Sequence, residues 1–266
     1  MTEGRPTKTR LDEALVSRGL AETRSKARAL ILARDVTVNG SMVDRAGAGV
    51  TSADVIALVA KARFASRGGE KIDHALETFG IDVAGMTVAD LGASTGGFTD
   101  CLLQRGAAKV YAVDVGYGQL AERVRTDPRV VVMDRTNARH LESLPELVDR
   151  VVIDVSFISL KLILPVAARL LKPDGVCVPL IKPQFEAGPR DLGKGGVVKD
   201  PRVHRRVLEE IIEAAHGTGF GVRGLTASSL KGPAGNVEFL AWLELGAKSA
   251  DGSAMIDWAM EEAATR

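Results

Sequence analysis

Apolar runs of strand length alternate with helical patterns from Thr87 onward, and this alternation limits the fold more than any other feature of the chain. Helical patterns lie between several of the runs, notably Leu160–Leu171 and the segment from Pro201 to Gly217. Such alternation predicts an α/β domain with a mainly parallel, doubly wound sheet covered by helices on both faces. The expected strands are Thr87–Leu91, Lys109–Asp114, Val130–Met133, Arg150–Val155, Gly175–Ile181, Arg223–Ala227 and Val237–Leu243.

The first expected strand ends in a glycine-rich turn, DLGASTGGF at residues 90–98. A tight turn of bare backbone at a strand end lets a ligand approach the chain, and the following helix N-terminus points at that ligand. NAD enzymes use a related turn, so the motif alone leaves the cofactor open. The contacts that we expect from this turn come from Asp90, Gly92, Ser94, Gly96, Gly97 and Phe98.

The ends of the next two expected strands supply further cofactor candidates. Asp114 follows Asp90 by 24 positions and could accept hydrogen bonds from both hydroxyls of a ribose, in NAD or in S-adenosylmethionine alike. Two details favour S-adenosylmethionine: the turn departs from Gly-x-Gly-x-x-Gly, and its preceding acid suits an ammonium group better than a diphosphate. Asp134 or Asn137 could face the adenine, although each could equally cap its own loop.

Four charged residues stand where their side chains should reach the same edge of the sheet. Asp154 lies near the end of one expected strand, Lys182 ends another, and Glu238 opens the last. Lys71 opens a helix after Gly68 and Gly69. A charge in an otherwise apolar strand costs several kcal/mol unless it is paired, so such placements indicate buried ion pairs or a functional site. All four together favour the functional site, and we expect them to be catalytic.

The N-terminal segment reads as a separate small domain with a basic character. Residues 1–71 contain 13 Lys and Arg against 8 Asp and Glu, whereas the remainder has 22 against 26. Two short helical patterns at 11–19 and 23–33 precede a hairpin with the turn at Asn39 and Gly40 and a last strand, Val55–Val59. A basic appendage of this kind suggests a module that binds a polyanion, which the resemblance described below identifies as RNA. The candidate RNA-binding residues are Arg10, Arg18, Arg24, Lys26 and Arg28, with Arg63 and Arg67 in the following linker.

These patterns predict four segments: a small basic domain at 1–60, a linker at 61–71, an α/β cofactor-binding domain at 72–247 and a peripheral tail at 248–266. The two glycines of the linker suggest a hinge. Because Lys71 follows that hinge, we hypothesise that RNA docking repositions the linker and completes the site. The segment Ala187–Lys199, with Arg190 and Lys194, could be a mobile lid or an ordinary surface loop.

Specific sequence stretches carry a family resemblance. With the turn DLGASTGGF, Lys71, Asp154, Lys182 and Glu238 resemble the Lys-Asp-Lys-Glu tetrad of FtsJ-like ribose 2′-O-methyltransferases. The pattern RLDEALVSRGLAETRSKARALILARDVTVNG resembles the alpha-L RNA-binding domain of a small-subunit ribosomal protein and of pseudouridine synthases. With STGGFTDCLLQRGAAKVYAVDVGYGQL, RTNAR, DVSFISL, IKPQFEAG and GPAGNVEF, nearly the whole chain is similar to the TlyA family of bacterial rRNA (cytidine-2′-O)-methyltransferases, also called hemolysins.

The resemblance implies a Rossmann-like class I methyltransferase sheet behind a small α+β RNA-binding domain. It also implies S-adenosylmethionine as cofactor and a cytidine ribose in ribosomal RNA of one or both subunits as acceptor. Lys182 would then either deprotonate the 2′-hydroxyl or stabilise the alkoxide as a cation, with the two carboxylates orienting the lysines. One departure is Phe64, where some members of the family carry a Trp in the linker.

Several alternatives stay open at this point. A membrane-active cytolysin, an RNA-binding protein without activity and a methyltransferase for small molecules or proteins each explain part of the pattern. Against the cytolysin stands the lack of any apolar run long enough to span a bilayer. The polar start of the chain favours a cytoplasmic protein, and the scattered histidines and cysteines predict no metal. The sequence does not indicate an oligomeric state.

Overall fold

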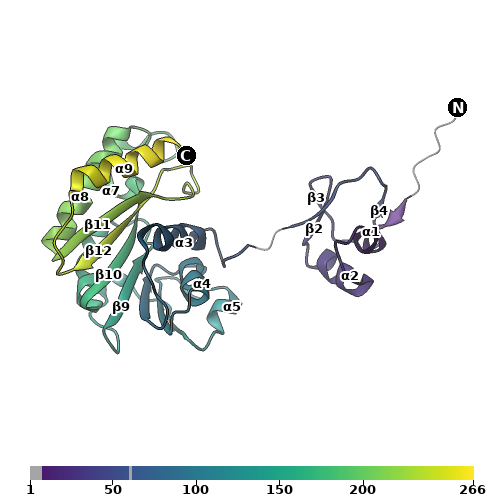
Figure 1. Ribbon diagram of the computed structural model, residues 1–266, viewed down its shortest axis with the longest axis horizontal. Coiled ribbons are helices and arrows are strands. Elements are labelled where there is room, and N and C mark those ends of the chain that lie inside the picture. The colour runs from purple at the N-terminus through teal and green to yellow at the C-terminus, as the bar shows by residue number, and fades with distance from the viewer. Residues whose placement is uncertain (1–7, 60–61) are drawn as a thin grey trace. The chain divides into compact units, whose positions relative to one another are not determined.

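The computed structural model describes residues 8–59 and 62–266, and the chain divides between Ala62 and Arg63 into two compact units. Figure 1 shows both units, with many of their helices and strands labelled. Each unit has its own hydrophobic core and is described by itself.

The smaller unit is the expected α+β domain. Two helices pack around Leu11, Leu15 and Ile31, which are fully buried. Thr23 begins the second helix, and its hydroxyl accepts a hydrogen bond from the backbone N–H of Lys26 at 3.2 Å. The elements are β1 (Thr9–Arg10) paired with β4 (Gly49–Val50), the helices α1 (Leu11–Ser17) and α2 (Arg24–Leu32), and a sheet of β3 (Ser41–Met42), β2 (Val36–Val38) and β5 (Ile56–Leu58).

The larger unit is built on a mixed sheet, and the expected α/β class is confirmed. In its described residues the strand order is β11-β12-β10-β9-β6-β7-β8. The strands from β6 to β10 run parallel, whereas β12 is antiparallel to both of its neighbours. The strands are β6 (Thr87–Leu91), β7 (Lys109–Val113), β8 (Val130–Met133), β9 (Val148–Ile153), β10 (Leu171–Ile181), β11 (Phe220–Ala227) and β12 (Phe239–Leu245).

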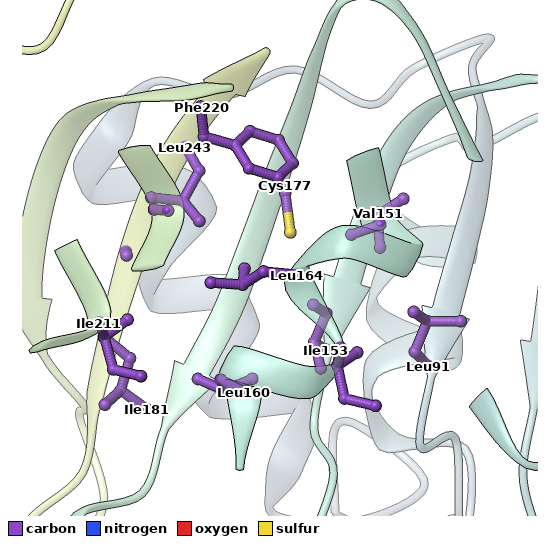
Figure 2. Close-up of a cluster of buried hydrophobic side chains, with 14 of the residues drawn as sticks. Leu91, Val151, Ile153, Leu160, Leu164, Cys177, Ile181, Ile211, Phe220 and Leu243 are labelled. Carbon is purple, nitrogen blue, oxygen red and sulfur yellow. The ribbon is translucent and has the colours of Figure 1, made fainter. Parts of the chain in front are cut away.

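Helices cover both faces of this sheet because side chains alternate between the faces along each strand. Val88 of β6 packs with the cluster of α3, α4 and α5, whereas Leu91 packs with the cluster of α6, α8 and α9. Figure 2 shows the second cluster, with Ile153, Leu164 and Ile211 among its members. The helices are α3 (Gly68–Phe79), α4 (Gly97–Gln104), α5 (Glu122–Arg125), α6 (Leu164–Leu170), α7 (Pro183–Glu186), α8 (Pro201–Gly217) and α9 (Gly252–Ala264), with 3-10 turns η1 (Ala138–His140), η2 (Leu160–Leu162) and η3 (Pro189–Asp191).

The predicted helix Leu160–Leu171 is wrong in detail. The structure forms the turn η2 first and then the shorter helix α6, with Pro165 in its first turn. A proline has no backbone N–H to donate to the preceding turn, so the helix has to begin again at that point. Leu171 already belongs to β10. The expected helix from Pro201 is confirmed as α8.

Residues 248–266 are not a peripheral tail, because they include α9. Asp251 caps this helix by accepting a hydrogen bond from the N–H of Ser253 at 3.0 Å. Ile256 is buried in the core of the larger unit. Glu262 accepts hydrogen bonds from the Thr226 hydroxyl at 2.7 Å and from the next backbone N–H at 2.9 Å. The segment is therefore an integral layer over β11.

The end of the predicted linker also differs from a flexible hinge. Phe64 is buried in the core of the larger unit, and Asp100 accepts a hydrogen bond from the N–H of Ala65 at 2.7 Å. Gly68 and Gly69 form the first turn of α3. A Cβ atom on Gly69 would lie only 2.3 Å from the Phe64 side chain, so the lack of a side chain at this glycine permits the close packing. In the described ranges no helix is long and apolar enough to cross a membrane.

Candidate active site

One cavity of about 850 Å³ in the larger unit brings the predicted catalytic residues and the glycine turn together. Leu91 of β6 lies opposite Ile153 of β9 in register, so the residues that follow both strands emerge at one edge. Lys182 follows the next strand, β10, at the same edge. The predicted catalytic and cofactor-binding residues that line the cavity are Lys71, Gly92, Ser94, Gly97, Phe98, Asp154, Lys182 and Glu238.

Lys182 and Asp154 form an ion pair in this cavity. The Lys182 Nζ atom lies 2.6 Å from Asp154 Oδ1, and both side chains are largely buried. Nζ also donates hydrogen bonds to the Val155 carbonyl at 3.0 Å and to the Ser156 hydroxyl at 2.9 Å. Two of the three N–H donors of the ammonium are used by these acceptors, and the Asp154 carboxylate balances its charge. The lysine head is thus held in one position at the edge of the sheet.

Lys71 and Glu238 form a second ion pair, which is buried more deeply. Lys71 Nζ lies 2.5 Å from Glu238 Oε2, with side-chain exposures of 10% and 1%. The other carboxylate oxygen accepts a hydrogen bond from Gln184 Nε2 at 3.2 Å. Glu238 precedes β12 instead of opening it, so its side chain is placed by the loop before the strand. The predicted tetrad is thus arranged as two ion pairs that line one cavity.

The glycine turn shapes this edge through one close backbone approach. Gly92 has φ +94°, and a Cβ atom there would lie 2.6 Å from the Asp154 carbonyl oxygen. Glycine alone tolerates both the positive φ and this close approach, so Gly92 lets the turn pack against the backbone of Asp154. Asp114 is bonded to the neighbouring loops: its carboxylate accepts from Ser94 N at 2.8 Å and from Gly116 N at 2.7 Å. Gly96 is the residue before α4.

Asp90 lies beneath the turn and does not line the cavity. It is fully buried, and its Oδ2 atom accepts a hydrogen bond from the Thr99 hydroxyl at 2.6 Å. Its Oδ1 atom has no hydrogen-bond partner among the residues that the structure describes. Burial raises the pKa of Asp90 to about 7, although the bond from Thr99 acts in the opposite direction.

Because of this raised pKa, we expect the stability of the fold to depend on pH. Between about pH 4 and pH 7 the folded chain holds a proton on Asp90 that the unfolded chain has released, so stability falls as pH rises through this window. The loss is on the order of 4 kcal/mol when complete. We expect Asp90→Asn to flatten this dependence, measured by urea unfolding from pH 4 to 8 against wild type. Parallel curves for the two proteins would contradict it.

Two other predicted cofactor contacts have loop-capping bonds in the structure. Asn137 Oδ1 accepts a hydrogen bond from Arg139 N at 3.0 Å and begins η1. Asp134 Oδ2 accepts from Gly118 N at 3.0 Å. Neither residue lines the cavity, so their contact with adenine stays a prediction.

In the smaller unit a buried acid gathers three of the predicted RNA-binding arginines. The fully buried carboxylate of Asp12 pairs with Arg10 at 3.0 Å, Arg24 at 3.3 Å and Arg28 at 3.0 Å. The hydrogen bonds from Arg10 above all, and those from the other two, hold the pKa of Asp12 well below its usual range. The three arginine side chains remain about half exposed. Sequence reasoning missed Asp12, because nothing in the spacing shows that this acid is buried.

The other predicted RNA-binding residues make different contacts. Arg18 donates to the carbonyls of Thr51 and Asp54, and Lys26 pairs with Glu22. In the larger unit, Arg63 forms an ion pair with Asp73 and stacks on Phe64, with its guanidinium carbon 4.6 Å from the ring centre. Arg67 is exposed and lines the cavity.

Two aromatic residues at the cavity were also missed. Phe157 is 91% exposed and has φ +61°, a left-handed backbone that such a bulky residue rarely adopts. Its ring centre lies 4.9 Å from that of Phe185, and both rings line the cavity. A signal was present: each phenylalanine follows a predicted catalytic residue, Asp154 or Lys182, by three positions.

The expected lid is anchored at its far end. Asn236 is buried, accepts a hydrogen bond from Val198 N at 2.9 Å and donates one to the Gly196 carbonyl at 3.2 Å. Leu192 and Gly195 of the same loop line the cavity. Motion of the loop stays a prediction. Within the described part of the chain, no three His, Cys, Asp or Glu side chains are grouped to hold a metal.

Comparisons with known proteins agree with this geometry. The FtsJ-like methyltransferase family matches residues 64–245, and the S4 domain matches residues 9–56. TlyA of Mycobacterium tuberculosis, a 16S/23S rRNA (cytidine-2′-O)-methyltransferase, is 47% identical over 240 residues, which cover 89% of this chain and 90% of that protein. YqxC of Bacillus subtilis, named as a candidate rRNA methyltransferase, is 48% identical over 245 residues, with coverage of 89% and 85%. A solved structure from Streptococcus thermophilus that carries a hemolysin name has a TM-score of 0.75 at 40% identity, covering 98% of this chain and 97% of that one.

Proposed function

The chain belongs to the FtsJ-like methyltransferase family and carries an S4 domain, and from this premise we propose that it methylates the 2′-hydroxyl of a cytidine in ribosomal RNA. The methyl donor is S-adenosylmethionine. One observation carries the proposal: the two ion pairs, Lys182 with Asp154 and Lys71 with Glu238, line one cavity with the glycine turn. The S4 domain then supplies the contact with RNA, and its arginines around Asp12 are suited to phosphate groups.

The cavity fits the methyl donor in size and chemistry. Its volume of about 850 Å³ lies within the range of small-molecule sites, and Gly92 and Gly97 of the turn line it. Ser94 and Gly97 would contact the donor there. Asp114 is not among the residues that line the cavity, so its contact with the ribose of the donor stays a prediction. The unpartnered oxygen of Asp90 beneath the turn is an acceptor near the site of a cationic group. When bound, the donor supplies a methyl group already activated on a sulfonium.

The protein then has to align a ribose hydroxyl and stabilise the charge that develops on its oxygen. Lys182 is the group for this task, because Asp154, Val155 and Ser156 hold its ammonium in place. We assign it the role of a cation beside the developing alkoxide. Asp154 Oδ1 is buried against this ammonium, whereas the side chain as a whole is 25% exposed, so the other carboxylate oxygen, Oδ2, can receive the hydroxyl proton. Lys71, fixed by Glu238, holds the ribose or a neighbouring phosphate.

The exposed aromatic pair provides a place for the target base. Nucleobases stack on aromatic rings, and each such contact contributes about 1–3 kcal/mol. Phe157 and Phe185 stand directly beside the residues that hold Lys182, so a base stacked there places its ribose near the ammonium. A flat, exposed ring at this cavity is difficult to explain by packing alone.

We therefore expect Phe157→Ala to raise the KM for rRNA or lower kcat, giving a loss of about 10- to 100-fold in kcat/KM. The affinity for S-adenosylmethionine and the melting temperature should stay unchanged, because the ring is 91% exposed. Trp258→Ala is the matched control, since this aromatic side chain is also exposed but lies on α9. Equal activity of Phe157→Ala and wild type would rule out the stacking role.

The proposal as a whole is tested by methyl transfer. Purified protein and labelled S-adenosylmethionine are incubated with one substrate at a time: small ribosomal subunits, large ribosomal subunits or free rRNA. The 2′-O-methyl sites in each RNA are then mapped. We expect label in RNA at a cytidine ribose. Binding of RNA without transfer would indicate an RNA-binding protein, and label in protein or small molecules would indicate another acceptor. Either outcome would refute the proposal. Comparison of the substrates also identifies the ribosomal subunit that is methylated.

A further inference from the structure

One turn of helix holds the loop that carries Phe157 at two points. Lys182, which immediately precedes α7, donates to Val155 and Ser156 at the start of the loop. Glu186, four positions later, accepts from the Ser159 hydroxyl at 2.6 Å and from Leu160 N at 2.8 Å, at the end of the loop. Lys182 is extended and Glu186 is the last residue of the four-residue α7, so one short segment, residues 182–186, supplies both contacts.

The loop between these two anchors is under backbone strain. Phe157 has a positive φ and an almost fully exposed ring, so its own packing contributes little to holding that conformation. Strained residues persist only where the surrounding structure fixes them, and they cluster at functional sites. The anchors on either side, one at Lys182 and one at Glu186, are the contacts that hold this conformation.

Glu186 has no direct part in the site. It does not line the cavity, and both of its carboxylate oxygens are used by the loop. Burial raises the pKa of this carboxyl, so keeping a carboxylate at this position carries a desolvation cost. The cap of η2 does not require it, because the hydroxyl of Ser159 already accepts a hydrogen bond from Lys161 N.

We propose that Glu186 is a positioning residue for the target nucleotide. By holding Ser159 and Leu160, its carboxylate keeps Phe157 against Phe185, and the base stacked on these rings brings its 2′-hydroxyl to Lys182. The same short segment, residues 182–186, thus carries the charged group that activates the hydroxyl and the clamp that orients the base. This inference rests on the proposed function.

A double-mutant cycle on the full-length protein tests the inference. We expect Glu186→Ala to lower kcat/KM for rRNA about tenfold, with unchanged affinity for S-adenosylmethionine. In a Phe157→Ala background the same change should have almost no further effect, because Glu186 acts through that ring. Glu186→Gln keeps one acceptor and gains a donor that the Ser159 hydroxyl can accept, so it should restore most of the activity.

Glu210→Ala is the control: this acid pairs with Lys161 beside the same loop but does not contact Phe157. If Glu186→Ala unfolds, Ser159→Ala removes one of the two bonds and takes its place in the cycle. Losses that multiply in the double variant, or full activity of Glu186→Ala, would overturn the positioning role. Wild-type protein is assayed first, and its failure to methylate rRNA would instead refute the proposed function and this role with it.

Discussion

Lys182→Ala should lower kcat for RNA methylation by about 10³-fold, the scale observed when an enzyme loses one group that stabilises a developing oxyanion. Its ammonium is the charged donor that Asp154, Val155 and Ser156 hold at the cavity edge. The glycine turn, which is a separate part of the cavity, is untouched by the substitution. Binding of S-adenosylmethionine, measured by calorimetry, should therefore stay within a few-fold of wild type.

Lys182→Arg separates the two possible roles of this lysine. An arginine keeps the positive charge but cannot be deprotonated in a protein, so it can stabilise an alkoxide without acting as a base. Our assignment predicts that Lys182→Arg retains measurable transfer well above Lys182→Ala. The matched control is Lys161→Ala, an exposed lysine paired with Glu210. Loss of cofactor binding in Lys182→Ala would move the residue from the RNA side of the site to the cofactor side.

Part of this site follows from sequence by a simple physical rule. The carboxyl ends of parallel strands meet at one edge, so Gly92, Asp154 and Lys182 were predictable neighbours once their strands were recognised. The rule does not apply to Lys71 and Glu238, because Lys71 lies on a helix and Glu238 precedes an antiparallel strand. Their place in the same site was indicated only by unexplained charges in apolar segments and by the family resemblance.

Other features escaped because sequence periodicity shows which positions are apolar but not which polar groups are buried. Asp12 is surrounded by three arginines that come from β1 and α2, a tertiary arrangement. α9 packs Met255, Ile256, Ala259 and Met260 against the core, but local sequence does not show which layer a terminal helix covers. The strained backbone of Phe157 depends on contacts with α7, which no local pattern records.

The glycines before Lys71 show how one residue type supports opposite interpretations. Gly68 and Gly69 suggested a hinge because glycine loosens an isolated chain. In the fold the second glycine is required by the ring of Phe64, and Ser66 and Gly68 form part of the cavity wall. In this conformation the close packing of Phe64 on Gly69 places Lys71 in the first turns of α3, and movement of the linker on RNA docking stays a prediction.

The buried pair of Lys71 and Glu238 gives a second large effect. Glu238→Ala leaves the Lys71 ammonium, only 10% exposed, without its carboxylate partner. Removing one member of a buried ion pair costs about 3–5 kcal/mol, and we expect urea unfolding to show a loss of that size. Methyl transfer should fall together with stability. In contrast, Glu210→Ala breaks an exposed pair with Lys161 and should cost less than about 1 kcal/mol.

The double variant Lys71→Met with Glu238→Leu separates stability from catalysis. Replacing both charges by apolar side chains of similar size leaves no unpaired charge, and such replacements are often neutral or stabilising. We expect the unfolding free energy to return to near the wild-type value, while transfer to rRNA stays as low as in Glu238→Ala. If the double variant regained methylation, the pair would be a structural element of the cavity wall. If it regained stability alone, the two charges are retained for the chemistry, because the fold does not need them.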